Sequence, residues 1–383
     1  MITQPRSGLL NLTFNPGTPP ASPLLWPIPP HVNPAEASDI WTVDDNALGT
    51  MARDWSAAQT MTITQAAADS FKVCLMMIDM QITFCNPSMS LFCSGDSGLG
   101  AVEDVVRASR YIYQNIGYIT EIDCTLDTHY RHAIFHQDFW LDRNGNHPAM
   151  YTIITADAVE AGEWIPAPAA TWAGYGNMMM ANRVRRHVIQ YTRRLADRGR
   201  YPLIIWPQHA KLGNVEHALA PMLYEAVEWH AAARGTNPIY EIKGADIFFE
   251  MYSALSTEVE ETDLETPEIN TGFLQRLLEF DMVIACGEAA SHCFAWTIDD
   301  MLAHPLMVQD PSLARKFVIL GDCTSSVVIR DPATGQIFPG SPANPTDFRP
   351  MADAAFQRFE AAGMRIITTN TPIPEIPGYG TRS

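Results

Sequence analysis

The sequence predicts an α/β protein with a doubly wound, three-layer α/β/α fold. We expect a mostly parallel sheet of about six strands, with an N-terminal extended arm and an insertion added to it. Two observations support this prediction: short, nearly continuous apolar runs alternate with helical patterns from Lys72 onward, and ionisable residues gather just after those runs. Strands that are apolar on both faces and separated by helices are typical of a parallel sheet covered on both sides.

The apolar runs are the candidate strands, and they occupy residues 73–79, 118–125, 202–207, 239–243, 281–286, 316–322 and 365–369. The helices expected between them cover residues 101–115, 179–197, 213–234, 269–279, 292–303 and 350–362. Ligands bind beyond the carboxyl ends of the strands in this architecture. The residues that directly follow each run are therefore the candidates for a functional site.

The domain organisation follows from composition along the chain. We expect an N-terminal extension at 1–67, a main domain at 68–372 and a C-terminal tail at 373–383. The main domain should carry an insertion at about 130–178, where aromatic and turn-forming residues interrupt the pattern. The acidic stretch 256–268 is expected to be a solvated loop.

Residues 15–35 contain too much proline for a helix or a central strand and should run as an extended arm. Four apolar side chains of this arm need cover, namely Leu24, Leu25, Trp26 and Ile28. The cover could be the surface of the same chain or a neighbouring subunit. Because soluble monomers avoid exposed apolar strips, we expect a homo-oligomer in which the arm, the insertion or both cross the interface.

The amino-acid composition and net charge indicate which kinds of molecule the protein can bind. The chain has 383 residues, 47% of them hydrophobic and 18% charged, with a formal net charge of -18. Such a charge repels a phosphate backbone and an anionic membrane, so we expect a small-molecule substrate and no nucleic acid or membrane partner. The opening MITQPRSG lacks the features of a secretory signal, and we expect a cytoplasmic protein.

The seven cysteines form an odd number without a CxxC pair, which fits neither a disulfide framework nor a thiolate zinc site. Cys293 differs from the others because a loop of small residues leads from a buried strand into a helix whose first turn contains it, with Ser291 as the expected N-cap. Helix amides and the helix dipole stabilise a thiolate at that position. A lone cysteine is nevertheless more often a small buried apolar residue.

Short motifs follow the strand ends in order: DMQITF at 79–84, LDTH at 126–129, WPQH at 206–209, EIKGAD at 241–246 with YS at 252–253, and GEAASHC at 287–293. Together they resemble the nicotinamidase branch of the isochorismatase-like cysteine hydrolases, over about residues 70–372. Each motif is weak alone, and the five in order are fairly specific.

The resemblance implies a catalytic triad of Asp79, Lys243 and Cys293. Asp79 would take the thiol proton and return it to the departing amine, and Lys243 would favour the thiolate. The alternative is that Asp79 caps a turn and Lys243 is a surface charge. A charged residue that ends an apolar strand inside a candidate site favours the functional interpretation.

The resemblance also implies an oxyanion hole made by the backbone amides of Ala289 and Cys293, with a cis peptide bond between Glu288 and Ala289. Glu288 is charged where we expect an apolar residue. The aromatic residues Phe84 and Trp206 would form a slot for a flat ring, although both could equally be core residues. His292 is expected to face away from Cys293, because adjacent residues on a helix do not share a face.

Asp127, His129 and His209 are the metal ligands that the resemblance implies. One carboxylate and two imidazoles suit a divalent transition ion, with zinc the foremost candidate and iron or manganese as alternatives. His132 and His136 are near in sequence, but neither falls at the spacing expected of a fourth ligand.

The sequence therefore predicts a cysteine amidase that cleaves a small, nicotinamide-like amide through a thioester on Cys293, with release of ammonia or an amine. An isochorismatase-type or carbamoyl hydrolase on the same fold is the nearest alternative. A catalytically silent binding or assembly module is the alternative of another class.

Overall fold

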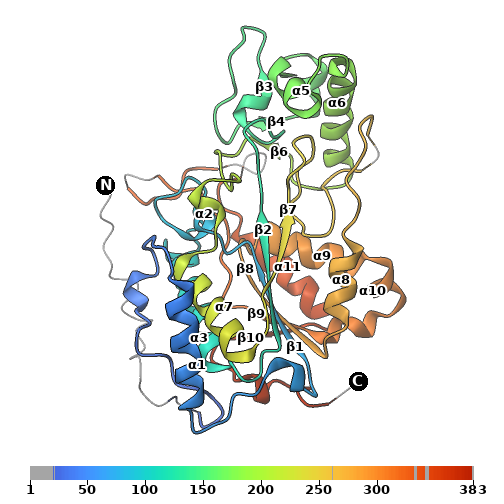
Figure 1. Cartoon of the computed structure of the whole chain (residues 1–383). Helices are drawn as coiled ribbons and strands as arrows, with labels where there is room; N and C mark the ends of the chain where they lie inside the picture. The colour runs from blue at the N-terminus through green and yellow to red at the C-terminus, as the bar shows by residue number, and fades with distance from the viewer. Residues whose placement is uncertain (1–19, 21, 261, 332–333, 341–344, 382–383) are drawn as a thin grey trace.

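A six-stranded parallel sheet forms the centre of the molecule (Figure 1). The computed structural model describes residues 20, 22–260, 262–331, 334–340 and 345–381. The strand order is β10-β9-β8-β1-β2-β7, and every neighbouring pair is parallel. The strands are β1 (Val73–Ile78), β2 (Glu121–Asp127), β7 (Ile239–Lys243), β8 (Met282–Gly287), β9 (Phe317–Leu320) and β10 (Arg365–Ile367). The predicted α/β fold with a sheet of about six parallel strands is confirmed.

The chain starts the sheet near its centre and winds outward in both directions. From β1 it continues to β2 and β7 on one side, and β8, β9 and β10 lie on the other. The strand order therefore reverses between β1 and β8, and a crevice at the carboxyl ends of two such strands is where this architecture binds ligands. Asp79 follows β1 directly, and Cys293 begins the helix that follows β8.

Helices cover both faces of the sheet (Figure 1). One face carries α1 (Asp45–Ala57), α3 (Gly100–Gln114) and α7 (Pro221–Arg234). The other carries α8 (Thr271–Leu278), α9 (Cys293–Ala303), α10 (Pro305–Gln309) and α11 (Arg349–Ala361). The strands β1 and β8 are buried along their whole length, as their unbroken apolar sequences require. No helix among the described residues has the length and apolar character needed to cross a membrane.

Residues 130–206 rise above the carboxyl end of the sheet, and we call this region the cap (Figure 1). Its elements are β3 (Trp140–Leu141), β4 (Ile153–Ile154), α4 (Ala156–Glu160), β5 (Ile165–Pro166), α5 (Pro168–Tyr175), α6 (Ala181–Asp197) and β6 (Leu203–Ile204). The helix expected at 179–197 is thus present as α6. It packs against α4, α5 and β5 in the cap.

The prediction that 202–207 is a strand of the main sheet is wrong. Only Leu203–Ile204 forms a strand, and it pairs antiparallel with β4 in the cap. Pro202 and Pro207 flank the run and have no N–H to donate, so a long strand cannot form there. The helix expected at 213–234 also begins later, with α7 starting at Pro221, because proline is accepted at the first turn of a helix and disrupts its interior.

The acidic stretch is not simply a solvated loop, because its first part is buried. Ser256, Thr257, Glu258 and Val259 all lie in the interior. A carboxylate of Glu258 forms an ion pair with Arg200 at 3.4 Å. Burial raises the pKa of Glu258 to about 7 although the Arg200 charge opposes this shift. The composition of the stretch could not indicate that a partner for Glu258 lies in a distant segment.

The described part of the arm packs on its own domain. Trp26 is only 3% exposed, its indole N–H donates to the Met61 carbonyl at 2.9 Å, and its ring meets the edge of Tyr118. A Cβ at Gly117 would lie 2.2 Å from the Trp26 ring, so the contact requires glycine there. Ile28 is also buried, and Leu24 and Leu25 are half-buried.

The apolar strip of the arm therefore does not need a second subunit to cover it, which removes that reason for expecting an oligomer. Residues 1–19 and 21, which include the beginning of the arm, lie outside the described residues. The oligomeric state itself stays a prediction.

Replacing Trp26 with alanine is expected to lower the free energy of unfolding by about 3–5 kcal/mol, because it removes a large buried ring from a site shaped around it. Urea denaturation measures the loss. The matched control is Trp172→Ala, since Trp172 is 60% exposed and its replacement should change stability by less than about 0.5 kcal/mol. If Trp26→Ala instead left stability unchanged and lowered the molecular mass in light scattering, the arm would be a contact between subunits.

Candidate active site

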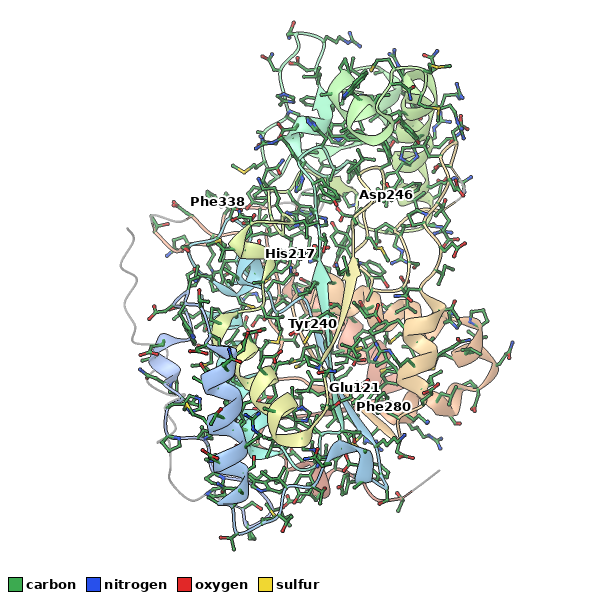
Figure 2. The ribbon with its side chains drawn as sticks, viewed as in Figure 1. Glu121, His217, Tyr240, Asp246, Phe280 and Phe338 are labelled. Atoms are coloured by element: carbon green, nitrogen blue, oxygen red, sulfur yellow. The ribbon has the colours of Figure 1, made fainter. Side chains whose placement is uncertain are left out.

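The strand ends bring the predicted catalytic side chains together. The register of β2 and β7 places Asp127 directly beside Lys243, and that of β1 and β8 places Ile78, just before Asp79, beside Gly287. Figure 2 marks the two ends of the sheet: Glu121 begins β2 at one end, and Asp246 follows β7 at the other, towards the cap. The candidate site lies at the Asp246 end.

The Lys243 ammonium group is the centre of this arrangement. Its Nζ lies 2.9 Å from Asp79 Oδ2, 2.9 Å from Asp127 Oδ1 and 3.6 Å from Cys293 Sγ. It also donates to the Met251 carbonyl at 3.2 Å. The Lys243 residue is only 4% exposed, so these are contacts of a buried cation with two carboxylates and a thiol.

The charges at the site are strongly coupled. Burial opposes the positive charge of Lys243, but Asp127, Asp79 and Cys293 raise its pKa well above the ordinary value, so it remains an ammonium. Burial raises the pKa of the Cys293 thiol, as do the charges of Asp79 and Asp127, while Lys243 acts in the opposite direction. The resting side chain is therefore a thiol, and its sulfur lies within 4.8 Å of a carboxylate oxygen of Asp79.

Thr125 of β2 fixes the orientation of Asp79. The Asp79 backbone N–H donates to Thr125 Oγ1 at 3.0 Å, and the Thr125 hydroxyl donates to Asp79 Oδ1 at 2.5 Å. Asp79 has a φ of 47°, which is uncommon for a residue with a side chain and turns the carboxylate out of the strand. Its second oxygen is thereby left for Lys243 and Cys293.

The loop before Cys293 differs in one detail from expectation. The peptide bond between Glu288 and Ala289 is cis, as predicted. The N-cap of α9, however, is His292 with φ -129° and ψ -103°, and not Ser291. The Ser291 hydroxyl is engaged elsewhere, since it accepts from the Val327 N–H and contacts His292 Nδ1. Among the described residues, the backbone N–H groups of Ala289 and Cys293 have no hydrogen-bond acceptor.

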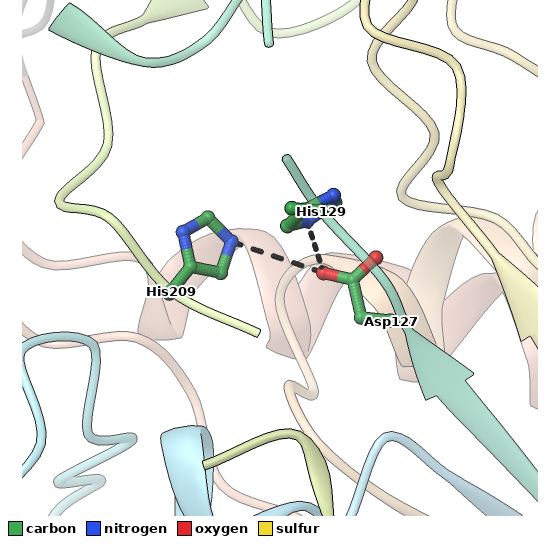
Figure 3. A group of neighbouring side chains, drawn as sticks. All are labelled: Asp127, His129 and His209. Carbon is green, nitrogen blue, oxygen red and sulfur yellow. Dashed lines mark hydrogen bonds and ion pairs between the residues drawn. The ribbon is translucent and has the colours of Figure 1, made fainter. Parts of the chain in front are cut away.

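The predicted metal ligands also converge (Figure 3). Asp127 ends β2, His129 follows it, and His209 comes from the loop after the cap. His129 Nε2 lies 2.7 Å and His209 Nε2 3.8 Å from the same oxygen, Asp127 Oδ2. One ligand atom of each side chain lies within 4.8 Å of those of the other two, and all three residues are buried.

The electrostatics of this cluster suit a cation. Burial opposes ionisation of Asp127, but His129 and Lys243 hold its pKa well below the ordinary value. Burial and the neighbouring His129 lower the pKa of His209 to about 3, so its ring is neutral and can act as a ligand. A buried carboxylate with two imidazoles fits a divalent transition ion such as zinc.

Of the two additional histidines, only one lies near the cluster. His136 Nε2 is 3.4 Å from His209 Nδ1, and burial with the neighbouring histidines lowers the pKa of His136 to about 2. His132 instead contacts the Asp138 carbonyl.

Two residues that support Asp127 were not singled out from the sequence. The Gln81 side chain donates to the Asp127 carbonyl at 2.9 Å and accepts from the Asp127 N–H at 2.8 Å, so it fixes the end of β2. Gly244 has a φ of 75°, and a Cβ there would lie 2.7 Å from Asp127 Oδ1 and 2.8 Å from His129. The backbone can approach the cluster only because this residue is glycine. Their positions inside the DMQITF and EIKGAD motifs are the signals that could have identified them.

A small cavity opens over these groups. Its lining includes the predicted Phe84, Trp206, Asp127, His209, Ala289 and Cys293, together with Leu91, Cys93, Glu250, Tyr252, His292 and Val327. His292 was expected to face away from Cys293, yet both residues line this cavity. The rule for adjacent helical residues does not apply, because the backbone of His292 is not helical.

Glu250 and Tyr252 reach the cavity from the segment after β7. The Tyr252 hydroxyl accepts the Trp206 indole N–H at 2.9 Å, which holds the Trp206 ring at the cavity wall. The sequence could not indicate this contact, because 46 positions separate the two residues.

No protein-family model matches the chain, and no curated protein matches it by sequence. Among solved structures it is similar to the nicotinamidase and pyrazinamidase of Acinetobacter baumanii, with 16% identity, 79% of this chain and 98% of that chain covered, and a TM-score of 0.44. It is similar to the yeast nicotinamidase bound to the inhibitor nicotinaldehyde, with 15% identity, coverages of 77% and 99%, and a TM-score of 0.44. It is also similar to the zinc complex of Pyrococcus horikoshii pyrazinamidase, with 16% identity, 78% of this chain and 99% of that chain covered, and a TM-score of 0.37. Likenesses this distant concern the fold, and we infer function from the geometry of this chain.

Proposed function

We propose that this chain is a cysteine hydrolase that cleaves a small, nicotinamide-like amide through a thioester on Cys293. The observation that carries the proposal is the buried Lys243 ammonium group, which contacts Asp79, Asp127 and the Cys293 sulfur beside a cavity. A cavity that holds a nucleophile, a base and a fixed cation has the parts that amide hydrolysis by a thiol requires.

In the first half-reaction, Asp79 takes the proton of the Cys293 thiol, and the sulfur attacks the carbonyl carbon of the amide. The oxygen of the tetrahedral intermediate accepts from the free N–H groups of Ala289 and Cys293. The C–N bond then breaks as Asp79 returns the proton to the nitrogen, and ammonia or an amine leaves. The acyl group remains on sulfur as a thioester.

In the second half-reaction, water attacks the thioester and gives its proton to Asp79. The C–S bond breaks, the sulfur regains the proton, and the carboxylic acid leaves. Burial raises the pKa of Asp79, and the Lys243 charge opposes that shift, so Lys243 favours the carboxylate form of Asp79 at the start of each half-reaction. Lys243 also offsets the negative charge that forms on sulfur. The sum is one amide and one water converted to one acid and one amine.

Asp127, His129 and His209 would hold a divalent ion, with zinc the foremost candidate and iron or manganese as alternatives. When bound, the ion would supply a Lewis acid at the cavity. Phe84 and Trp206, which both line the cavity, would hold the flat ring of the substrate between them.

The test of this proposal is an ammonia-release assay over a panel of amides: nicotinamide, benzamide, two small aliphatic amides and one carbamoyl compound. We expect the largest kcat/KM with an aromatic amide, because the cavity wall is aromatic. If ammonia were released from the carbamoyl compound alone, the substrate would be a carbamoyl compound and not an amide. If no amide were hydrolysed while Cys293 remained open to alkylation, a binding module on this fold would be the better account.

Replacing His129 with alanine is expected to lower the metal content of the purified protein by at least about tenfold, since one of three protein ligands is lost. Metal analysis by mass spectrometry measures the content before and after the change. The control is His187→Ala, because His187 is equally buried but contacts Thr262 and Phe248, away from the cluster. An unchanged metal content in His129→Ala would place the metal elsewhere.

A further inference from the structure

Two carboxyl groups that the mechanism above does not use meet beneath the loop that precedes Cys293. Glu288 is 0% exposed and Asp104, on α3, is 1% exposed. Both side chains contact Ser325, whose hydroxyl donates to Asp104 at 2.5 Å and whose N–H donates to Glu288 at 3.3 Å. Glu288 directly precedes Ala289, whose amide is one of the two free donors at the cavity.

The surroundings decide which of the two carries a proton. Asp104 Oδ1 accepts from Arg107 at 3.1 Å, and Asp104 Oδ2 accepts from the Ser325 hydroxyl at 2.5 Å. Glu288 Oε2 accepts only the Ser325 N–H, at 3.3 Å, and Glu288 Oε1 has no N–H or O–H donor among the described residues. Two buried carboxylates in contact cannot both be ionised. Arg107 and Ser325 stabilise charge on Asp104, so the proton resides on Glu288.

The other titratable groups around Glu288 do not change this assignment. They are the thiols of Cys85 on α2, Cys93 in the loop after α2 and Cys286 on β8, and none of them can supply a positive charge. Burial, followed by the charge of Asp104, raises the pKa of Glu288 well above its ordinary value. A neutral Glu288 is thus a donor, and Asp104 is its acceptor.

Ser325 connects this pair to the backbone of the loop. Its carbonyl accepts from the Ala290 N–H at 2.9 Å, its N–H donates to Glu288, and its hydroxyl donates to Asp104. The Glu288 N–H donates to the Ile78 carbonyl at 2.7 Å. The residues on both sides of Ala289 are therefore held, one by the carboxyl pair and the other by Ser325.

We propose that Glu288 is a positioning residue: its protonated carboxyl group donates to Asp104 and holds the Ala289 amide where the oxyanion of the substrate forms. This inference rests on the proposed amidase function. It also gives a reason for a charged residue type at a position where the sequence led us to expect an apolar one.

The first measurement is independent of activity. In an infrared difference spectrum of the full chain at neutral pH, the unmodified protein minus Glu288→Gln should show the carbonyl band of one protonated carboxylic acid, because the bands of other buried acids such as Glu258 cancel. The control is Asp347→Asn, which removes a carboxyl group whose pKa Arg349 lowers, so the corresponding difference spectrum should lack that band. A Glu288→Gln difference spectrum without the band would overturn the assignment of the proton.

The second measurement separates positioning from general stability. Glu288→Gln keeps a neutral donor, and we expect its kcat to stay within about threefold of the unmodified protein. Glu288→Leu removes the donor. We expect its kcat to fall about 10²-fold, which is the loss associated with removal of one oxyanion donor. Its KM should stay within about twofold of the unmodified protein. Alkylation of Cys293 by iodoacetamide needs no oxyanion hole, so its rate should be unchanged in both variants.

An unchanged kcat in Glu288→Leu would overturn the inference, and so would a parallel loss of kcat and of alkylation rate. If Glu288→Leu does not fold, Ser325→Ala takes its place, because it removes the hydroxyl link to Asp104 alone. If the unmodified protein released no ammonia from any amide, the proposed function would fail, whereas the infrared result would still decide where the proton lies.

Discussion

Replacing Cys293 with alanine is expected to lower kcat by about 10⁶-fold, the scale seen when a covalent nucleophile is removed from a hydrolase. The thioester cannot form without the sulfur, and among the described residues Cys293 is the thiol at the cavity that contacts the Lys243 ammonium group. Substrate binding should persist, because the cavity walls are unchanged. Ammonia release measures turnover, and calorimetry measures binding of the amide.

Cys124→Ala is the matched control for this change, since Cys124 is a fully buried thiol within β2 and does not line the cavity. Its activity should remain close to that of the unmodified protein. Alkylation that abolishes activity should map to Cys293 alone among the seven cysteines. Full turnover by Cys293→Ala would contradict the thioester mechanism.

Replacing Asp79 with asparagine is expected to lower kcat by about 10⁴-fold, because an amide of the same shape cannot take the thiol proton. The rate of Cys293 alkylation at neutral pH should not fall, since the Asp79 charge raises the pKa of the thiol and the variant lacks that charge. Steady-state kinetics and iodoacetamide labelling measure the two effects.

Asp123→Asn serves as the control, because it makes the same chemical change at a fully buried carboxylate of β2. It should leave both rates unaltered. If Asp79→Asn kept full turnover, another group would be the base for the thiol.

The sequence was sufficient for the main sheet because its signal is local and repeated. β1, β8 and β9 are short apolar runs, and β2 and β7 alternate apolar with polar residues. The same criterion failed at 202–207, where the run is equally apolar. Its pairing partner β4 lies in the cap, and the identity of a pairing partner is a non-local property that an isolated run does not contain.

The sequence could predict those residues of the candidate site that lie at the carboxyl ends of strands. Asp79, Asp127 and Lys243 end or follow strands, and parallel register alone brings such residues to one edge. The contributions of Glu250, Tyr252 and His292 to the cavity depend on loop conformations. The partnership of Glu288 with Asp104 joins residues from separate elements, and neither residue has a local pattern that indicates it.

The pairing of β4 with β6 has a consequence for how this protein can change over evolutionary time. The last part of the cap, which leads to Trp206 and His209, is hydrogen-bonded to the first part through β4, through Tyr151 and Thr152, and through Phe135. Trp206, which lines the cavity, and His209, a candidate metal ligand, are therefore held in place by the same set of hydrogen bonds. Exchange of residues 130–178 with a foreign segment would disturb both at once, so this part of the cap is not a separable module. We therefore expect this protein to acquire new substrates by single substitutions of residues that line the cavity, and not by exchange of the cap with that of another protein.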